Sequence, residues 1–125
     1  EFPGIKIVAL QFSMADPAKG MNVAENILTA NQDLNGFFAS SEPSSVGVAQ
    51  ALKGHRLGGK VKFVAFDRSD AMDADTKAGI IDAMVVQDPV KLGYEAVRTV
   101  VDKLNGKTPE RRIDLNAKVL RKADL

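Results

Sequence analysis

Short apolar runs alternate along the chain with longer stretches in which apolar residues recur every three or four positions. This alternation predicts strands separated by amphipathic helices. The predicted strands cover residues 5–10, 37–39, 60–66, 83–86 and 113–119, and the predicted helices cover residues 17–30, 41–54, 69–77 and 89–105. The run Ile5–Leu10 is mostly apolar, as expected of a strand covered on both faces.

Helix starts are marked by capping residues followed by proline. Asp16-Pro17 and Asp88-Pro89 each place an acidic N-cap before proline at the first helical position, and Ser41 stands two residues before Pro43. The helices separate strands with short connections, so we expect a single α/β domain. Its doubly wound, mostly parallel sheet should carry helices on both faces.

Composition excludes several classes of protein. The 125 residues contain 17 basic and 16 acidic side chains, so the net charge of +1 gives no reason to expect a nucleic-acid partner. Cysteine is absent, which excludes disulfides and thiolate zinc sites. We find no export signal in the chain and no apolar run near the ~20 residues that span a bilayer.

Polar residues follow four of the predicted strands. In an open parallel sheet, ligands bind beyond the carboxyl ends of the strands. This rule selects residues 11–16, 40–42, 67–69 and 87–88, which include no histidine. Carboxylates that accept hydrogen bonds, beside an amide that donates and accepts them, suit a neutral polyhydroxyl ligand. Asp67 could instead have a purely structural role, as the N-cap of the helix that begins near Ser69.

Catalytic motifs fail on inspection. Residues 54–60 match most of a phosphate-binding loop, but Val61 stands where a magnesium-holding hydroxyl is required, and the segment precedes a strand. Asp67 and Asp70 lack the second acidic pair of a phosphotransfer or metal site. His55 is the only histidine, and the sequence has no Gly-x-Ser-x-Gly nucleophile elbow with which it could form a hydrolase triad. We therefore predict no enzyme activity, no metal and no cofactor.

Several of these segments carry a family resemblance. These are residues 18–30, 36–39, 63–67 and 85–89, together with Leu92-Gly93-Tyr94. In these segments the sequence resembles the second half of a ribose-type periplasmic sugar-binding protein, the type I solute receptor of an ABC importer. The resemblance implies a periplasmic or extracytoplasmic protein whose two α/β lobes close over a sugar, with the importer's membrane subunits as partners. It also implies that Asp67 and Gln87 hydrogen-bond the sugar hydroxyls.

Two positions depart from the family pattern. Ribose binders have an asparagine where Ser41 stands and a stacking aromatic where Ala15 stands. Ser41 can still bond a hydroxyl, and Phe12 or Met14 is left to supply the stacking surface. The ligand-binding residues we expect are therefore Asp67, Gln87, Ser41, Phe12 and the Ala15 position. Pentoses, hexoses, polyols and other small polar solutes all stay open as ligands.

The resemblance also divides the chain. Family members are about twice as long, which makes residues 1–87 the core of a ligand lobe. Residues 88–125 are then the helix and strand that return to a first lobe preceding Glu1. Without that lobe, the apolar stripe of the helix Pro89–Asn105 loses its partner. We expect the chain to be a fragment, or to form a homodimer through this helix.

Two other functions fit parts of the sequence. The effector domain of a lactose-repressor-like transcription regulator shares this fold, and would follow a helix-turn-helix upstream. An acidic-site enzyme or phosphoacceptor domain would depend on Asp67 and the acidic residues after it. Upstream sequence separates the first from a transport protein, and phosphorylation of Asp67 by a small phosphodonor would support the second.

Overall fold

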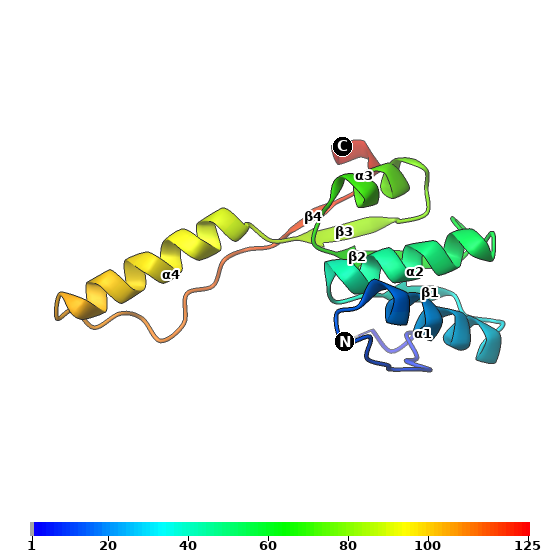
Figure 1. The fold of residues 1–125 in the computed structure, drawn as a ribbon, viewed down its shortest axis with the longest axis horizontal. Coiled ribbons are helices and arrows are strands. Elements are labelled where there is room, and N and C mark those ends of the chain that lie inside the picture. Colours follow the sequence, from blue (N-terminus) through cyan, green and yellow to red (C-terminus); the bar gives the residue numbers. More distant parts are fainter. Residues whose placement is uncertain (1) are drawn as a thin grey trace.

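The structure is a computed structural model, which describes residues 2–125. One sheet has the strand order β1-β2-β3-β4; β1, β2 and β3 run parallel, and β4 is antiparallel to β3. The strands are β1 (Gly36–Phe38), β2 (Lys62–Phe66), β3 (Ala83–Val86) and β4 (Lys118–Leu120). The helices are α1 (Pro17–Ala30), α2 (Glu42–Gly54), α3 (Asp70–Lys77), α4 (Pro89–Leu104) and the short 3-10 helix η1 (Lys122–Asp124). The α/β prediction with a mostly parallel sheet is confirmed (Figure 1).

The predicted capping residues begin their helices. The Asp16 carboxylate accepts a hydrogen bond from the Lys19 N–H at 2.8 Å, and Asp88 accepts one from the Lys91 N–H at 2.9 Å. These bonds satisfy N–H groups that the first helical turn leaves without a partner. Ser41 is the N-cap residue of α2, but its side chain makes no capping bond.

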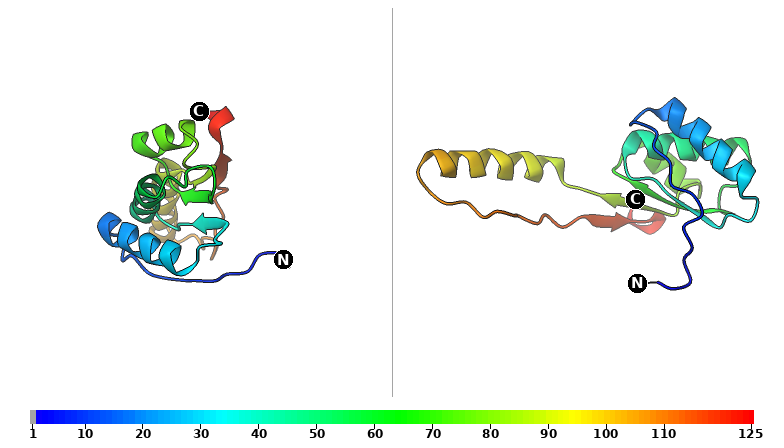
Figure 2. Two further views of the ribbon diagram at one scale, coloured as in Figure 1. Left: turned by 90° about the vertical axis from the view of Figure 1, so that its right-hand side faces the viewer. Right: turned by 90° about the horizontal axis from the view of Figure 1, so that it is seen from below.

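The core lies between one face of the sheet and the first three helices. Figure 2 shows α1, α2 and α3 together on one side of the strands. Phe63, Ala65 and Met84 point into this core and are fully buried beside Leu52 and Met72. We predicted helices on both faces, yet in residues 2–125 the other face has no helical cover, and Phe38 there is 61% exposed.

Helix α4 extends away from the sheet as an arm (Figure 1). None of its residues is buried, although its apolar side chains form a strong stripe. The exposed apolar residues of the helix are Val90, Leu92, Tyr94, Val97, Val100, Val101 and Leu104. The helix forms where we predicted it, but within the described chain its apolar side has no packing partner.

Two strand predictions are wrong. Residues 5–10 form no strand, and Ile7 is 81% exposed, because the segment runs outside the sheet and pairs with none of its strands (Figure 2). An apolar run becomes a strand only where a neighbouring strand takes its backbone hydrogen bonds. The last strand is also shorter than predicted, because only residues 118–120 pair with β3 and residues 113–117 are irregular.

The described helices include none that could cross a bilayer, because none combines sufficient length with sufficient apolar character.

Candidate functional site

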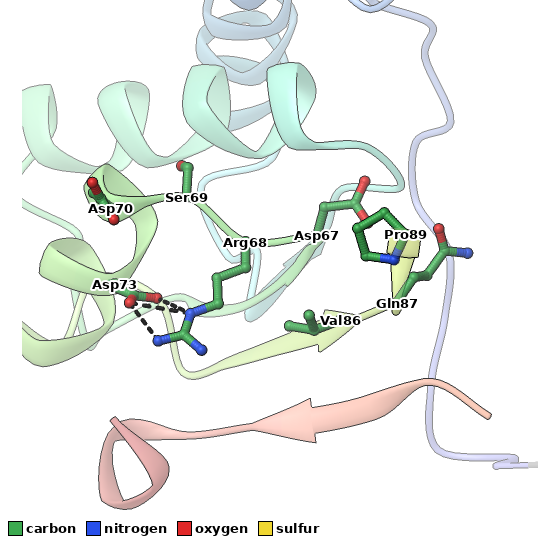
Figure 3. Close-up of a pocket in the computed structure, with 8 residues that line it drawn as sticks. All are labelled: Asp67, Arg68, Ser69, Asp70, Asp73, Val86, Gln87 and Pro89. Atoms are coloured by element: carbon green, nitrogen blue, oxygen red, sulfur yellow. Dashed lines mark hydrogen bonds and ion pairs between the residues drawn. The ribbon is translucent and has the colours of Figure 1, made fainter. Parts of the chain in front are cut away.

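An open hollow of about 570 Å³ lies at the carboxyl ends of β2 and β3, where the strands lead into α3 and α4. Its lining residues are Asp67, Arg68, Ser69, Asp70, Asp73, Val86, Gln87 and Pro89 (Figure 3). A volume of this size is within the range of small-molecule sites. The rule that ligands bind beyond the carboxyl ends of the strands selected residues 67–69 and Gln87 of this lining from the sequence. It also selected Asp88, which does not line the hollow.

Asp67 and Gln87 come from adjacent strand ends and lie on the same side of the hollow. Figure 3 shows the Asp67 carboxylate and the Gln87 amide on either side of the Pro89 ring in this view. The Asp67 N–H donates to the Val85 carbonyl at 2.9 Å, which ties the end of β2 to β3 two residues before Gln87. The sheet thus presents a carboxylate and an amide at neighbouring strand ends, both lining one hollow.

The backbone of Asp67 is unusual. Its φ angle of 66° lies in the left-handed region, which disfavours most residues with a side chain and which aspartate tolerates better than most. Asp67 does not cap α3, because Ser69 occupies the N-cap position. No side-chain hydrogen bond of Asp67 is present among the described residues, so its carboxylate is open to the hollow.

A second pair of charges lines the other side. Arg68 donates to both carboxylate oxygens of Asp73, with its closest approach at 2.7 Å, and its side chain points away from Asp67 (Figure 3). The hydrogen bond from Arg68 holds the pKa of Asp73 below its usual value, and the same bond raises the pKa of Arg68. Asp73 is therefore ionised at neutral pH and already paired.

The acidic cluster that follows β2 does not form a metal site in the described part of the chain. Residues 2–125 contain no group of three side chains placed to hold a metal ion. Asp75 is paired with Lys53 at 3.0 Å, while Asp70 and Asp73 lie in the first turn of α3, where a carboxylate interacts favourably with the helix dipole. The hydroxyl oxygen of Ser69 is buried and has no protein partner.

The remaining predicted ligand residues do not line this hollow. Phe12 and Ala15 are exposed on the segment that leads into α1, and Ser41 is half-buried at the start of α2. Met14 and Ala15 both have positive φ angles, of 54° and 55°, and the Asp16 N–H bonds the Ser13 carbonyl across them at 3.1 Å. These features define a type I′ turn, with two residues in the left-handed region.

Hydrogen bonds between serines connect this turn with the start of α2. Ser13 and Ser44 are joined through their hydroxyl oxygens at 2.7 Å, and Ser44 and Ser41 at 2.9 Å. The ranges 11–16 and 67–69 selected from the sequence include Ser13 and Arg68, but sequence analysis did not predict the Ser13–Ser44 bond or the Arg68–Asp73 pair. Four serines at positions 40, 41, 44 and 45 were a usable signal, because residues three and four apart share a helix face.

The lining can bind a hydroxyl-rich ligand and offers no arrangement for covalent catalysis. Asp67 is a strong acceptor for hydroxyl groups, and Gln87 can both donate and accept. His55 lies in the exposed turn after α2, which precedes β2; Gly54 is the last residue of α2, and residues 55–60 form the connecting loop that we predicted.

Comparison with known proteins places the chain in a family. Residues 1–108 match the model of the periplasmic binding protein domain. The chain is 32% identical to the ribose import binding protein RbsB of Haemophilus influenzae over 114 residues, or 91% of this chain and 38% of that protein. It is 32% identical to the D-allose-binding periplasmic protein of Escherichia coli over 98 residues, or 78% of this chain and 32% of that protein.

Solved structures agree with the sequence comparison. The structure of GanP, a glucose-galactose binding protein from Geobacillus stearothermophilus, superposes with a TM-score of 0.93 at 31% identity, covering 98% of this chain and 44% of that one. A carbohydrate transporter solute binding protein from Agrobacterium radiobacter, in complex with D-arabinose, gives a TM-score of 0.90 at 34% identity, covering 99% and 42%. The chain thus spans about two-fifths of its relatives' length. It belongs to the periplasmic binding protein family.

Proposed function

We propose that this chain is the C-terminal ligand lobe of a solute-binding protein that delivers a neutral sugar or polyol to an ABC importer, without catalysis. The observation that carries the proposal is the pair of Asp67 and Gln87 at adjacent strand ends, open to one hollow (Figure 3). Relatives named for ribose and allose support the sugar class, as does the structure bound to D-arabinose. The transcription-regulator alternative has no comparable support, and the protein is proposed to act in the periplasm or outside the cytoplasm.

Ser41, Phe12 and the Ala15 position are proposed as contacts made when the protein closes. They lie on the connections into α1 and α2, outside the hollow in the present arrangement. The exposed Phe12 ring, together with Met14, is available to cover the apolar face of a sugar ring.

In the whole protein, a first lobe is proposed to cover apolar surfaces that are exposed in this chain. Residues 1–87 form the lobe core, and residues 88–125 return to a first lobe that packs on α4. The exposed stripe of α4 supports this division, as does the coverage of about two-fifths of the relatives. A second copy of the chain is the proposed partner for α4 when the first lobe is absent.

Calorimetric titration of the whole binding protein with monosaccharides and polyols tests the function. A thermal-shift screen selects the ligand first, because a ligand that prefers the folded state raises the melting temperature. Asp67→Ala should then weaken binding about 30-fold, since a loss of ~2 kcal/mol follows when buried hydroxyls lose their acceptor.

Asp33→Ala is the matched control, because Asp33 is an exposed aspartate in the turn before β1, at the opposite end of the sheet. It should bind like the unaltered protein. Equal affinity of the Asp67→Ala and Asp33→Ala variants would show that the sugar does not contact Asp67.

A further inference from the structure

Hydrogen bonds of four serines join the turn before α1, the start of α2 and the end of β2; the serines are Ser13, Ser41, Ser44 and Ser45. Ser13 in the type I′ turn bonds Ser44, and Ser44 bonds Ser41, as described above. Ser45, in the first turn of α2, donates its hydroxyl to the Ser41 carbonyl at 2.9 Å and accepts from the Phe66 N–H at 3.1 Å. The chain of bonds therefore ends on the residue immediately before Asp67.

The bond to Phe66 takes the place of a missing strand contact. Strand β1 ends at Phe38, and its last hydrogen bond to β2 runs from the Ala39 N–H to the Val64 carbonyl at 3.1 Å. The Phe66 N–H lies beyond that point and has no β1 residue to receive it. The Ser45 hydroxyl, whose residue is 0% exposed, supplies the acceptor. A buried N–H without an acceptor is costly, so this bond fixes the end of β2.

Asp67 follows directly, in the left-handed backbone region at φ 66°. Such a conformation persists only where the surrounding structure holds it. Two bonds do so here: the Asp67 N–H donates to the Val85 carbonyl on one side, and the preceding Phe66 N–H donates to Ser45 on the other. Together they direct the Asp67 carboxylate to the side of the hollow where Gln87 lies (Figure 3).

We infer that Ser45 is a positioning residue for ligand binding, which acts through the backbone of Asp67 and does not itself touch the ligand. This inference rests on the proposed function, because it assigns Ser45 a role in the same site. Removal of the hydroxyl frees the Phe66 N–H, lets Asp67 leave the left-handed region and moves its carboxylate away from Gln87.

The test compares Ser45→Ala with Thr76→Val in the whole binding protein, titrated with the sugar that the unaltered protein binds. Thr76 is a matched control, because it is 1% exposed and its hydroxyl makes one hydrogen bond, to the Met72 carbonyl at 2.8 Å, in the last turn of α3. Ser45→Ala should weaken affinity about 10-fold, the effect of one hydrogen bond, and Thr76→Val less than about 2-fold. Equal affinities of the two variants would overturn the inference.

A double-mutant cycle separates positioning from a general loss of structure. If Ser45 acts through Asp67, adding Ser45→Ala to Asp67→Ala should change affinity by less than about 2-fold, because the group being positioned is already gone. A full 10-fold further loss would overturn the inference while leaving the proposed function standing.

A backbone measurement keeps the inference testable if no sugar binds. In the 125-residue chain, nuclear magnetic resonance reports the amide exchange of Phe66 and the φ-dependent coupling of Asp67. Ser45→Ala should speed Phe66 exchange and shift the Asp67 coupling, and Thr76→Val should do neither. If Ser45→Ala does not fold, rapid exchange of Phe66 in the unaltered chain overturns the inference, and slow exchange supports it.

Discussion

The contact between α1 and α2 depends on a glycine whose replacement should be severely destabilising. At Gly47 an added Cβ would lie 2.5 Å from the Pro17 carbonyl oxygen, 2.6 Å from the Met21 nitrogen and 2.7 Å from the Gly20 carbonyl carbon. All three are backbone atoms of α1, so the clash cannot be relieved by the rotation of a side chain. Gly47→Ala therefore requires the two helices to separate.

The size of the effect follows from two opposing terms. Alanine gains up to about 1 kcal/mol over glycine inside a helix. Overpacking a tight core costs about 1–3 kcal/mol, and more where the backbone must shift. Three backbone clashes place the cost at or above the upper end of that range, about 3 kcal/mol or more. After the gain from alanine, we expect the free energy of unfolding to fall by about 2 kcal/mol or more, a large part of the ~5–15 kcal/mol typical of a domain.

Gly20→Ala is the matched control on the same interface. Gly20 is also buried in a helix, but a Cβ there would lie 3.4 Å from the Ser44 Cα and 3.6 Å from the Gly47 Cα, which is ordinary contact. This variant should be neutral or more stable by up to ~1 kcal/mol. Urea denaturation followed by circular dichroism measures both variants. Equal stability of Gly47→Ala and Gly20→Ala would refute the close approach of the helices.

Two further predictions concern charge and assembly, beside those for Asp67 and Ser45. Because the pKa of Asp73 is lower in the folded state, its pair with Arg68 stabilises the fold at pH values above the unfolded-state pKa of Asp73. This stabilisation is lost as the pH falls through the lower folded-state pKa. Arg68→Ala should move the Asp73 pKa upward in a carboxyl titration by magnetic resonance; an unchanged value would contradict the pairing. The 125-residue chain should self-associate in sedimentation velocity through α4, where Val97 is 65% exposed, and Val97→Glu should reduce this. A monomeric unaltered chain at high concentration would contradict it.

The helices were predictable because their signals are local. Asp16-Pro17 and Asp88-Pro89 fix helix starts through bonds that span three residues, and these bonds are present. The place of Asp67 and Gln87 at one end of the sheet was predictable for a related reason. Parallel strands connected by helices all end at the same edge, so residues that follow them are brought together whatever their distance in sequence.

Features that depend on distant partners were not predictable in the same way. The segment 5–10 has the composition of a buried strand, but composition does not supply a neighbouring strand to pair with. The Ser13–Ser44 bond joins residues 31 positions apart, and the Ser45–Phe66 bond spans 21 positions. A hydroxyl can serve as a cap, a surface group or a buried acceptor, and only the packing of α2 on the sheet selects between these roles.

Some features of the 125 residues are stabilised by contacts within the chain, and others are apolar surfaces that only a partner could cover. Contacts within the 125 residues fix the strand ends, the Asp67 conformation and the hydrogen bonds of Ser45. Half of the proposed sugar site is therefore already formed before any ligand binds. The apolar surfaces of the N-terminal segment, the open sheet face and α4 have no such internal contacts. Preorganisation lowers the entropic cost of binding but adds no contacts on the far side of a ligand. We therefore expect the chain alone to hold Asp67 and Gln87 in the arrangement of Figure 3, and yet to bind sugar far more weakly than the whole protein.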